Sequence, residues 1–329
     1  MNLKFKKEFE KSLSELKITQ NEKLAEKIFA KQIGFNEEKK TFLSHISFYL
    51  IFKGNFRPHG NIICYSGAPG TGKTTFVKTV AEAMGRPLII ISCAGLKENS
   101  EFSIFGDHSK PSLVAQAIVK SGCRNPIILF DELEKADQKI QKELVTIFKK
   151  YQRGEDYTDY FFEKEVKLAH TTFFATVNYK ERLSTKFKNE VLMKELSDYT
   201  DEDKKKILVL KKKEIQQKYE LKEDEIEKIL PEESLKLIIK IVKEKGIRRS
   251  EQALHKIIEE YIQTKQIGKK FEGREWIEKN VFPYQESFKL NRSHHFIFAS
   301  FIMSLILLMA LILKKITNKG SKKDYKTVN

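Results

Sequence analysis

The sequence predicts an α/β fold in which helices flank a mostly parallel sheet, followed by a small all-α subdomain and one C-terminal transmembrane helix. Three observations predict it. Short apolar segments alternate with helical patterns between Asn61 and Asn178, as in a parallel sheet with helices on both faces. Beyond Tyr199 only helical patterns follow. An uncharged run of 18 residues then covers 296–313.

The strand segments come in a clear order with helices between them. Helical patterns cover residues 22–52 and break at Gly34. Ligands of parallel sheets bind at the carboxyl ends of the strands, and the candidate site residues fall at those ends. We expect strands at 61–66, 87–93, 126–130 and 171–177, and helices at 74–84, 113–121 and 138–151.

The region after Tyr199 is predicted to be a separate helical subdomain, with helices at 201–219, 223–230, 232–245 and 249–264. The first 20 residues suit either a short charged helix or a mobile arm. The expected divisions are an N-terminal arm (1–20), a large α/β subdomain (21–199), a helical lid subdomain (200–268), a connector (269–295), the transmembrane helix (296–313) and a basic tail (314–329).

The loop after the first predicted strand has the GxxxxGK[ST] pattern of a phosphate-binding P-loop. Its glycines let backbone N–H groups close around phosphates, and the following helix adds the partial positive charge of its N-terminus. Lys73 is expected to reach the β- and γ-phosphates of ATP, and the Thr74 hydroxyl to bind Mg²⁺. The alternative is a glycine-rich turn that binds nothing. The expected nucleotide contacts are Gly67, Ala68, Pro69, Gly70, Thr71, Gly72, Lys73, Thr74 and Thr75.

Polar residues also end the third and fourth predicted strands. Asp131 is expected to hold Mg²⁺, directly or through water, and Glu132 to polarise the attacking water. An acidic pair in this position is often only a helix N-cap, but it is good evidence when it accompanies a P-loop at this spacing. Asn178 can orient water beside the γ-phosphate, or it can simply form a turn.

Charge and cysteine content narrow the possible partners. The net charge of +16 invites a nucleic-acid interpretation, but much of it is Lys and Glu mixed on helices, which disfavours nucleic acid as a partner. The three cysteines, Cys64, Cys93 and Cys123, lie far apart and form no CxxC pair. Neither a zinc site nor a disulfide framework is therefore predicted.

The run at 296–313 spans about 27 Å as a helix, close to the bilayer core of about 30 Å. It is apolar on all sides and stops at a lysine pair, which favours a membrane span over a buried helix. The simplest arrangement is a single-pass tail anchor with the ATPase domain facing the cytosol. The positive-inside rule, applied to the lysine-rich tail, favours the opposite orientation.

Taken together, the motifs resemble the AAA+ ATPase module of Lon proteases. The resemblance implies a P-loop AAA+ parallel sheet with a small helical lid, and it covers residues 21–265. Its motifs occur in order as GNIICYSGAPGTGKTT (60–75), GRPLIIISCAGLKENSE (85–101), CRNPIILFDELEK (123–135), HTTFFATVN (170–178), ELSDYTDEDKKKI (195–207) and GIRRSEQALHKII (246–258).

The resemblance also implies roles and partners. It implies a homo-oligomer, usually a hexameric ring, that threads a protein substrate past an aromatic pore loop near Phe105-Gly106. Arg248, from the lid, would touch the γ-phosphate. The implied roles are Walker A for Lys73 and Thr74, Walker B for Asp131 and Glu132, sensor 1 for Asn178 and sensor 2 for Arg248.

Two departures from the family change the expected activity. The resemblance includes neither the Lon peptidase domain with its Ser-Lys dyad nor the large N-terminal substrate domain, so we do not expect the chain to be a protease by itself. The position of the family's trans-acting arginine finger falls at Glu190, and an acid cannot stabilise the growing charge on a neighbour's γ-phosphate. Either Lys186, Lys188 or Arg182 stands in for it, or hydrolysis is slow.

The sequence thus favours a membrane-anchored ATPase that uses ATP and Mg²⁺ to unfold or remodel protein substrates at a membrane. The second hypothesis, which Glu190 motivates, is a switch or scaffold that binds ATP but hydrolyses it slowly without a partner. The third, which the net charge motivates, is a nucleic-acid remodeller.

Overall fold

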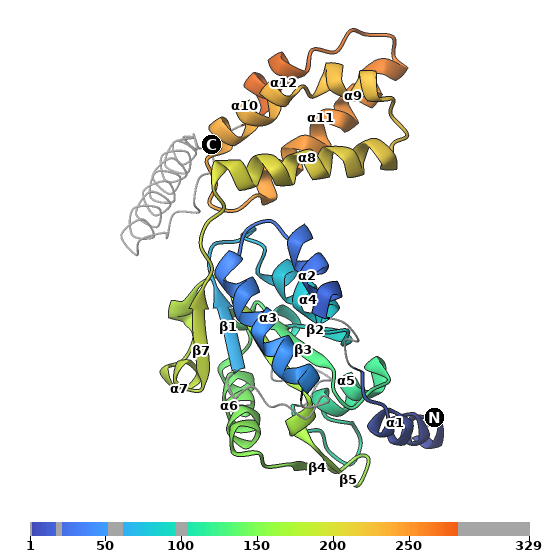
Figure 1. Cartoon of the computed structure of the whole chain (residues 1–329), viewed down its shortest axis with the longest axis vertical. Coiled ribbons are helices and arrows are strands. Elements are labelled where there is room, and N and C mark those ends of the chain that lie inside the picture. Colours follow the sequence, from blue (N-terminus) through green and yellow to red (C-terminus); the bar gives the residue numbers. More distant parts are fainter. Residues whose placement is uncertain (1, 18–21, 52–61, 97–103, 282–329) are drawn as a thin grey trace, which may run out of the picture. The chain divides into compact units, whose positions relative to one another are not determined.

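The computed structural model describes residues 2–17, 22–51, 62–96 and 104–281 of the 329-residue chain (Figure 1). Strands and helices alternate up to residue 195, and only helices follow. The strands are β1 (Ile62–Ser66), β2 (Leu88–Ser92), β3 (Ile127–Asp131), β4 (Tyr157–Asp159), β5 (Lys164–Val166), β6 (Thr172–Val177) and β7 (Val191–Glu195). The helices among them are α1 (Asn2–Ser14), α2 (Glu22–Lys31), α3 (Asn36–Ile51), α4 (Lys73–Ala83), α5 (Leu113–Ser121), α6 (Gln138–Arg153) and α7 (Thr185–Asn189).

Five strands form one parallel sheet in the order β2-β3-β6-β1-β7, which confirms the predicted parallel sheet flanked by helices. Strand β6 lies between β1 and β3, so the loop after β1 comes to lie beside the ends of both neighbours. Those ends are Ser66 in β1, Asp131 in β3 and Val177 in β6. Because all strands run the same way, their carboxyl ends share one edge of the sheet.

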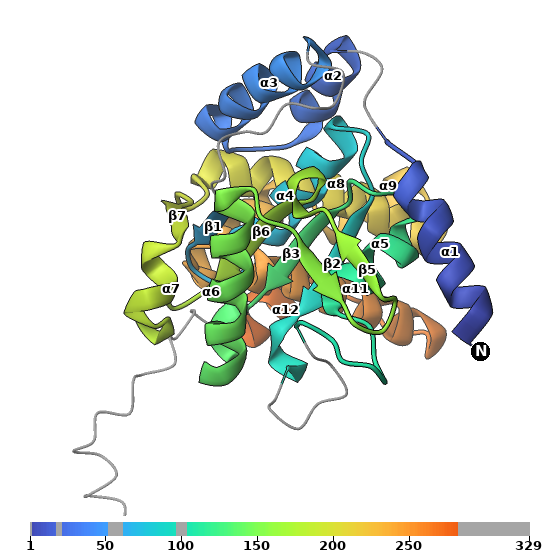
Figure 2. The ribbon, with the colours of Figure 1, turned by 90° about the horizontal axis from the view of Figure 1, so that it is seen from below.

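One face of the sheet packs against α3 and α4. Phe174 of β6 stacks on Tyr65 of β1, with ring centroids 6.2 Å apart. Phe174 also contacts Phe42 of α3, and Tyr65 contacts Phe76 of α4 edge-on. Figure 2 shows α2, α3 and α4 together on this side of the sheet. This aromatic layer anchors the helix that follows the P-loop.

The opposite face packs against α6, because successive side chains of a strand point to opposite sides of the sheet. Phe173, next to Phe174 in β6, contacts Phe130 of β3 and two rings of α6, Phe148 and Tyr151. The sheet is therefore the middle of three layers, and β1, β3 and β6 lie in its interior.

The N-terminal residues form a helix that packs on the α/β part. Phe9 of α1 is fully buried and stacks on Phe162, in the turn that joins β4 to β5, with ring centroids 4.1 Å apart. Beyond the helix, the Lys17 N–H donates to Asn125 Oδ1 at 2.9 Å. Of the two expectations for this segment, the structure shows the helix.

The helical part consists of α8 (Asp201–Lys218), α9 (Glu223–Ile229), α10 (Glu232–Val242), α11 (Arg248–Gln266) and α12 (Gly273–Asn280). Helix α8 begins with a capping box, in which Thr200 and Asp203 exchange side-chain-to-backbone hydrogen bonds. Leu208 of α8 and Leu254 of α11 are fully buried in the core of this part. Helix α12 falls in the segment 269–295 that the sequence suggested was a connector.

Strand β7 is not among the four strands predicted for the sheet; it forms an edge, and Leu192 in its middle is 42% exposed. Within the residues that the structure describes, no helix is long and apolar enough to cross a bilayer. The expected span at 296–313 and the tail at 314–329 lie outside the described residues, so both stay predictions.

Candidate nucleotide-binding site

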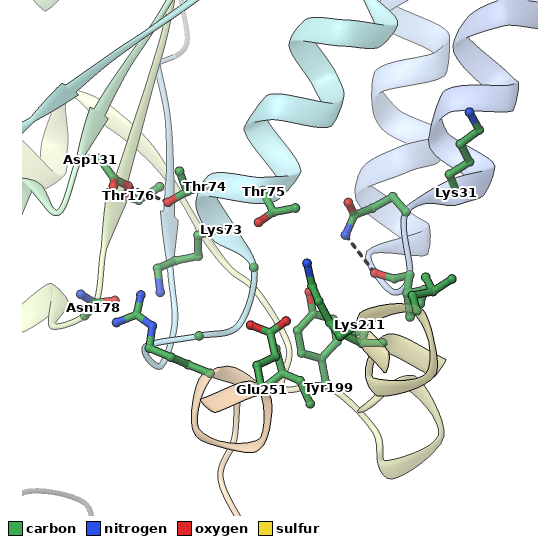
Figure 3. A pocket seen from close by; sticks show the side chains of 18 of the residues that line it. Lys31, Lys73, Thr74, Thr75, Asp131, Thr176, Asn178, Tyr199, Lys211 and Glu251 are labelled. Carbon is green, nitrogen blue, oxygen red and sulfur yellow. Dashed lines mark hydrogen bonds between the residues drawn. The ribbon is translucent and has the colours of Figure 1, made fainter. Parts of the chain in front are cut away.

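A pocket of about 380 Å³ opens at the carboxyl edge of the sheet (Figure 3). Its wall comes from the P-loop and the start of α4, the ends of β3 and β6, the end of α2, and helices α8 and α11. Segments far apart in the sequence thus meet around one cavity. Its volume lies in the range of small-molecule sites.

The P-loop adopts a conformation that depends on glycine. Gly70 and Gly72 both have φ of +82°, a left-handed backbone that other residues rarely adopt. A Cβ on Gly72 would also lie 2.2 Å from the Tyr199 hydroxyl. The Thr71 hydroxyl donates to the Ala68 carbonyl at 2.9 Å, inside the loop. Helix α4 starts at Lys73, so its unpaired N–H groups and positive dipole end meet the pocket.

Lys73 is held inside the loop by its own backbone. Its ammonium group donates to the carbonyl of Gly67 at 2.8 Å and to that of Ala68 at 2.9 Å. Burial lowers the pKa of Lys73 to about 8, and the nearby carboxylate of Glu134 is the largest opposing influence. The ammonium group lies where the phosphates of a nucleotide in the loop would draw it away from the carbonyls.

We expect the affinity for ATP to be constant below about pH 8 and to fall above it. Uncharged Lys73 must take up a proton to pair with phosphate, and the phosphates raise its pKa in the bound state. Between the pKa of Lys73 in the free protein and its higher pKa in the ATP-bound protein, each added pH unit therefore weakens ATP binding by at most about tenfold. Titration calorimetry from pH 7 to pH 10 measures this. A Lys73→Arg variant, whose guanidinium does not titrate, should lose the slope; a slope that persists would contradict the assignment.

Three oxygen groups meet at the end of the pocket where the sequence predicts Mg²⁺. Thr74 Oγ1 donates to Asp131 Oδ1 at 2.7 Å, and Thr176 Oγ1 donates to the same oxygen at 2.6 Å. The described residues contain no cluster of three or more His, Cys, Asp or Glu suited to a metal ion. One carboxylate and one hydroxyl fit Mg²⁺, which keeps several waters and usually takes its other ligands from phosphates. Thr74 and Asp131 would hold the ion, which neutralises phosphate charge when bound.

Glu132 and Asn178 are also brought together. Asn178 Nδ2 donates to Glu132 Oε1 at 3.3 Å, and Lys135 pairs with the other carboxylate oxygen at 2.5 Å. Glu132 has φ of +56°, a strained backbone for a residue with a side chain, and its N–H donates to Thr176 Oγ1 at 3.0 Å. The backbone of Glu132 therefore leaves the extended conformation directly after β3.

A buried carboxylate joins these two strand ends. Glu134 lies in the 3₁₀ turn after β3, is 7% exposed, and accepts the Asn178 N–H at 3.1 Å. This bond fixes the end of β6 against the turn that carries Glu132. The amide of Asn178 and the carboxylate of Glu132 consequently keep their relative position.

Arg248 reaches the pocket from the first residue of α11. The residues before it contact the P-loop directly: the Ile247 N–H donates to the Gly70 carbonyl at 3.2 Å. A Cβ on Gly246 would lie 2.5 Å from the carbonyl carbon of Gly70, so only glycine allows this approach. Arg248 therefore has a short, fixed connection to the loop that would hold the phosphates.

The sequence-predicted residues divide into two groups. Gly70, Gly72, Lys73, Thr74, Thr75, Asp131, Glu132, Asn178 and Arg248 all line the pocket. Gly67, Ala68, Pro69 and Thr71 shape the loop without lining the described pocket. Sequence reasoning missed Thr176, Tyr199 and Glu251, which line it too. A signal for Thr176 was present, because it is a hydroxyl in an otherwise apolar strand end, two residues before Asn178.

Two further residues that the sequence analysis singled out, Phe105 and Glu190, do not line the pocket. Phe105 is partly buried against the hydrophobic core, and residues 97–103 before it lie outside the described residues, so the pore loop stays a prediction.

Glu190 follows α7, and its carboxylate lies 3.4 Å from the Lys149 ammonium of α6. Of the suggested substitutes for the arginine finger, Arg182 lies with its guanidinium 4.9 Å from the ring centre of Tyr179.

Comparison with known proteins agrees with this geometry. Residues 63–199 match the family described as ATPase family associated with various cellular activities (AAA). Similar curated proteins are Lon proteases: that of Mycoplasma mobile is 32% identical over 208 residues, and that of Malacoplasma penetrans is 28% identical over 253 residues. A Lon protease of Helicobacter pylori is 30% identical over 200 residues.

These alignments cover 60%, 70% and 57% of this chain but only 24%, 31% and 23% of the three relatives. The chain thus spans less than a third of the relatives that it matches. The matched part is similar to AAA ATPase domains and, at modest identity, to the corresponding part of Lon proteases.

Proposed function

We propose that this chain is an ATP hydrolase whose AAA ATPase domain binds ATP with Mg²⁺ and uses its turnover to unfold or remodel protein substrates at a membrane. The observation that carries the proposal is the convergence of the P-loop, the paired Thr74 and Asp131, the paired Glu132 and Asn178, and Arg248 around one pocket. A structural turn would not require all of these polar groups at one edge of a sheet.

The residues divide the chemistry among themselves. Lys73 and the N–H groups at the start of α4 bind phosphate oxygens, and Thr74 with Asp131 would hold Mg²⁺. Glu132 accepts the proton of the attacking water, and Asn178 orients that water. Arg248 brings a positive charge from the helical part, so the affinity of the two parts for each other depends on the phosphates bound between them.

The assembly and the location are part of the proposal. The resemblance of the motifs to the AAA+ module of Lon proteases supports a homo-oligomer, a hexameric ring, acting on protein substrates. Because the matched part is the ATPase region, we propose no peptidase activity for it. The uncharged run at 296–313 supports a single-pass tail anchor, with the ATPase domain on the cytosolic side. A moving ATPase domain fixed to a bilayer would act on proteins at that surface.

The test is to reconstitute the full-length protein into liposomes, and to measure flotation, ATP hydrolysis and unfolding of a fluorescent reporter protein that carries an unstructured tail. We expect the protein to float with the vesicles, and ATP to drive loss of fluorescence. Replacing Mg²⁺ with EDTA should abolish both hydrolysis and unfolding. Protein that stays with the soluble fraction would refute the anchor, and hydrolysis without unfolding would refute the remodelling activity.

A second candidate is an ATP-dependent switch or scaffold that hydrolyses ATP slowly. The ion pair between Glu190 and Lys149 favours it, because a carboxylate occupies the position expected for the trans-acting arginine. In GTPases such arginines contribute about 10³–10⁵ in rate. ATP-dependent oligomerisation in analytical ultracentrifugation, with turnover no higher than that of a hydrolysis-deficient variant, would establish the switch in place of the motor.

A further inference from the structure

Glu251 is a pocket carboxylate to which neither the sequence motifs nor the proposed chemistry gives a role. It lies in the first turn of α11, three residues after Arg248, and residues at this spacing share one face of a helix. Figure 3 shows its carboxylate beside Tyr199, turned into the pocket. The residue is half-buried, and this burial raises the pKa of its carboxyl group.

The other two carboxylates of the pocket already have partners, whereas Glu251 has none. Asp131 accepts hydrogen bonds from two threonines, and Glu132 from Asn178 and Lys135. Among the described residues, no side chain or backbone group forms a hydrogen bond or an ion pair with the Glu251 carboxylate. The charges of Lys211 and Arg248 both act on Glu251, but Lys211 donates its hydrogen bond to Glu214, at 2.8 Å. A partly desolvated acceptor without a donor is costly unless a ligand supplies one.

The position of Glu251 along the pocket indicates which ligand group it meets. The phosphate end is defined by Lys73, Thr74 and Asp131. Lys31 of α2 and Lys211 of α8 lie on the side away from Asp131 and Asn178 (Figure 3). On the same side, the residues just after α2 and helix α8 contribute apolar side chains to the lining, which suit a flat base: Ile33, Ile207 and Leu210. Glu251 lines the pocket between the phosphate end and the apolar end (Figure 3).

The chemistry of a nucleotide then leaves one group for this carboxylate. Phosphate oxygens are acceptors and negatively charged, so they repel it, whereas the sugar between phosphates and base carries two hydroxyl donors. An ionised carboxylate is an acceptor only, and two oxygens can receive a vicinal diol. We infer that Glu251 accepts hydrogen bonds from the ribose hydroxyls of the bound nucleotide and makes the site selective for ribonucleotides. This inference rests on the proposed nucleotide binding.

The test compares the affinities of the full-length protein for ADP, 2′-deoxy-ADP, 3′-deoxy-ADP and GDP, which avoids hydrolysis during the measurement. Because hydrogen bonds to charged groups are the strong ones, we expect ADP to bind roughly tenfold to a hundredfold more tightly than at least one deoxynucleotide. In Glu251→Ala this preference should shrink to about twofold or less, and in Glu251→Gln it should be intermediate because the amide oxygen still accepts.

The matched control is Glu260→Ala, which removes an exposed carboxylate from the same helix and should leave every ratio unchanged. Equal binding of ADP and both deoxynucleotides by the unaltered protein would overturn the inference, as would a preference that survives in Glu251→Ala. A change in the ADP-to-GDP ratio instead of the ribose ratios would show that the carboxylate reads the base, and would also overturn it. If the unaltered protein bound no nucleotide at all, the proposed function itself would fail, which is a separate outcome.

Discussion

Replacing Glu132 with glutamine is expected to lower steady-state ATP turnover by about 10²–10⁴-fold, the usual contribution of a positioned general base. Glutamine has nearly the same shape and can still accept the hydrogen bond from Asn178 Nδ2. It cannot take a proton from water. Because Lys73, Thr74 and Asp131 remain in place, the affinity for ATP should stay almost unchanged.

The measurement is phosphate release at saturating ATP, together with the dissociation constant of ATP from calorimetry. Glu181→Gln is the matched control, because it removes the same charge from an exposed turn near the end of β6 and should leave turnover unaltered. Lys135→Gln separates the loss of the ion pair from the loss of the general base, since it removes the partner of Glu132 but keeps the Glu132 carboxylate. If Glu132→Gln retained the turnover of the unaltered protein, another group would have to act as the base.

The phosphate-binding part of the site was predictable because its information is local. A P-loop requires glycines at fixed spacing, a strand before and a helix after, and all of these are contiguous in the sequence. The structure accordingly places Lys73 and Thr74 at the start of α4, beside the end of β3. Asp131 could be placed for a related reason, because parallel strands share one carboxyl edge.

Which groups hold the predicted residues in position depends on the order of strands in the sheet, and a single sequence does not show that order. Thr176 bonds to Asp131, the last residue of β3, and to the N–H of Glu132, which follows it, only because β6 lies next to β3 in the sheet. Glu134 bonds to Asn178 for the same reason. Glu251 enters the pocket because the turn at Gly246 approaches the P-loop, a tertiary contact with no local signature.

The edge strand of the sheet and the N-terminal helix were harder still to predict from the sequence. Strand β7 has the short mixed sequence VLMKE, and its hydrogen bonds to β1 decide its structure more than its propensity does. The N-terminal helix carries six charged residues over Asn2–Ser14, which is typical of a solvated segment. Its docking depends on Phe9, whose partner Phe162 lies more than 150 positions away.

A second large effect is expected from Gly246→Ala. The added Cβ would lie 2.5 Å from the carbonyl carbon of Gly70, 2.6 Å from the Pro69 oxygen and 2.7 Å from the Gly70 oxygen. These are backbone atoms of the P-loop, which cannot rotate away as a side chain could. The clash is relieved only if the start of α11 moves off the loop, which breaks the bond from the Ile247 N–H to Gly70. Arg248 then leaves its place at the pocket.

We expect this variant to remain folded, because overpacking of this kind costs about 1–3 kcal/mol, and to lose about 10²-fold in turnover, the effect of displacing a catalytic group by about 1 Å. Thermal denaturation, ATP affinity and phosphate release together measure these quantities. Gly122→Ala is the control: it adds a methyl group in open space at φ of +63°, so it strains the backbone without touching the P-loop. Its turnover should equal that of the unaltered protein. Normal turnover in Gly246→Ala would mean that hydrolysis does not need the helical part against the P-loop, and Arg248 would lose its role at the γ-phosphate.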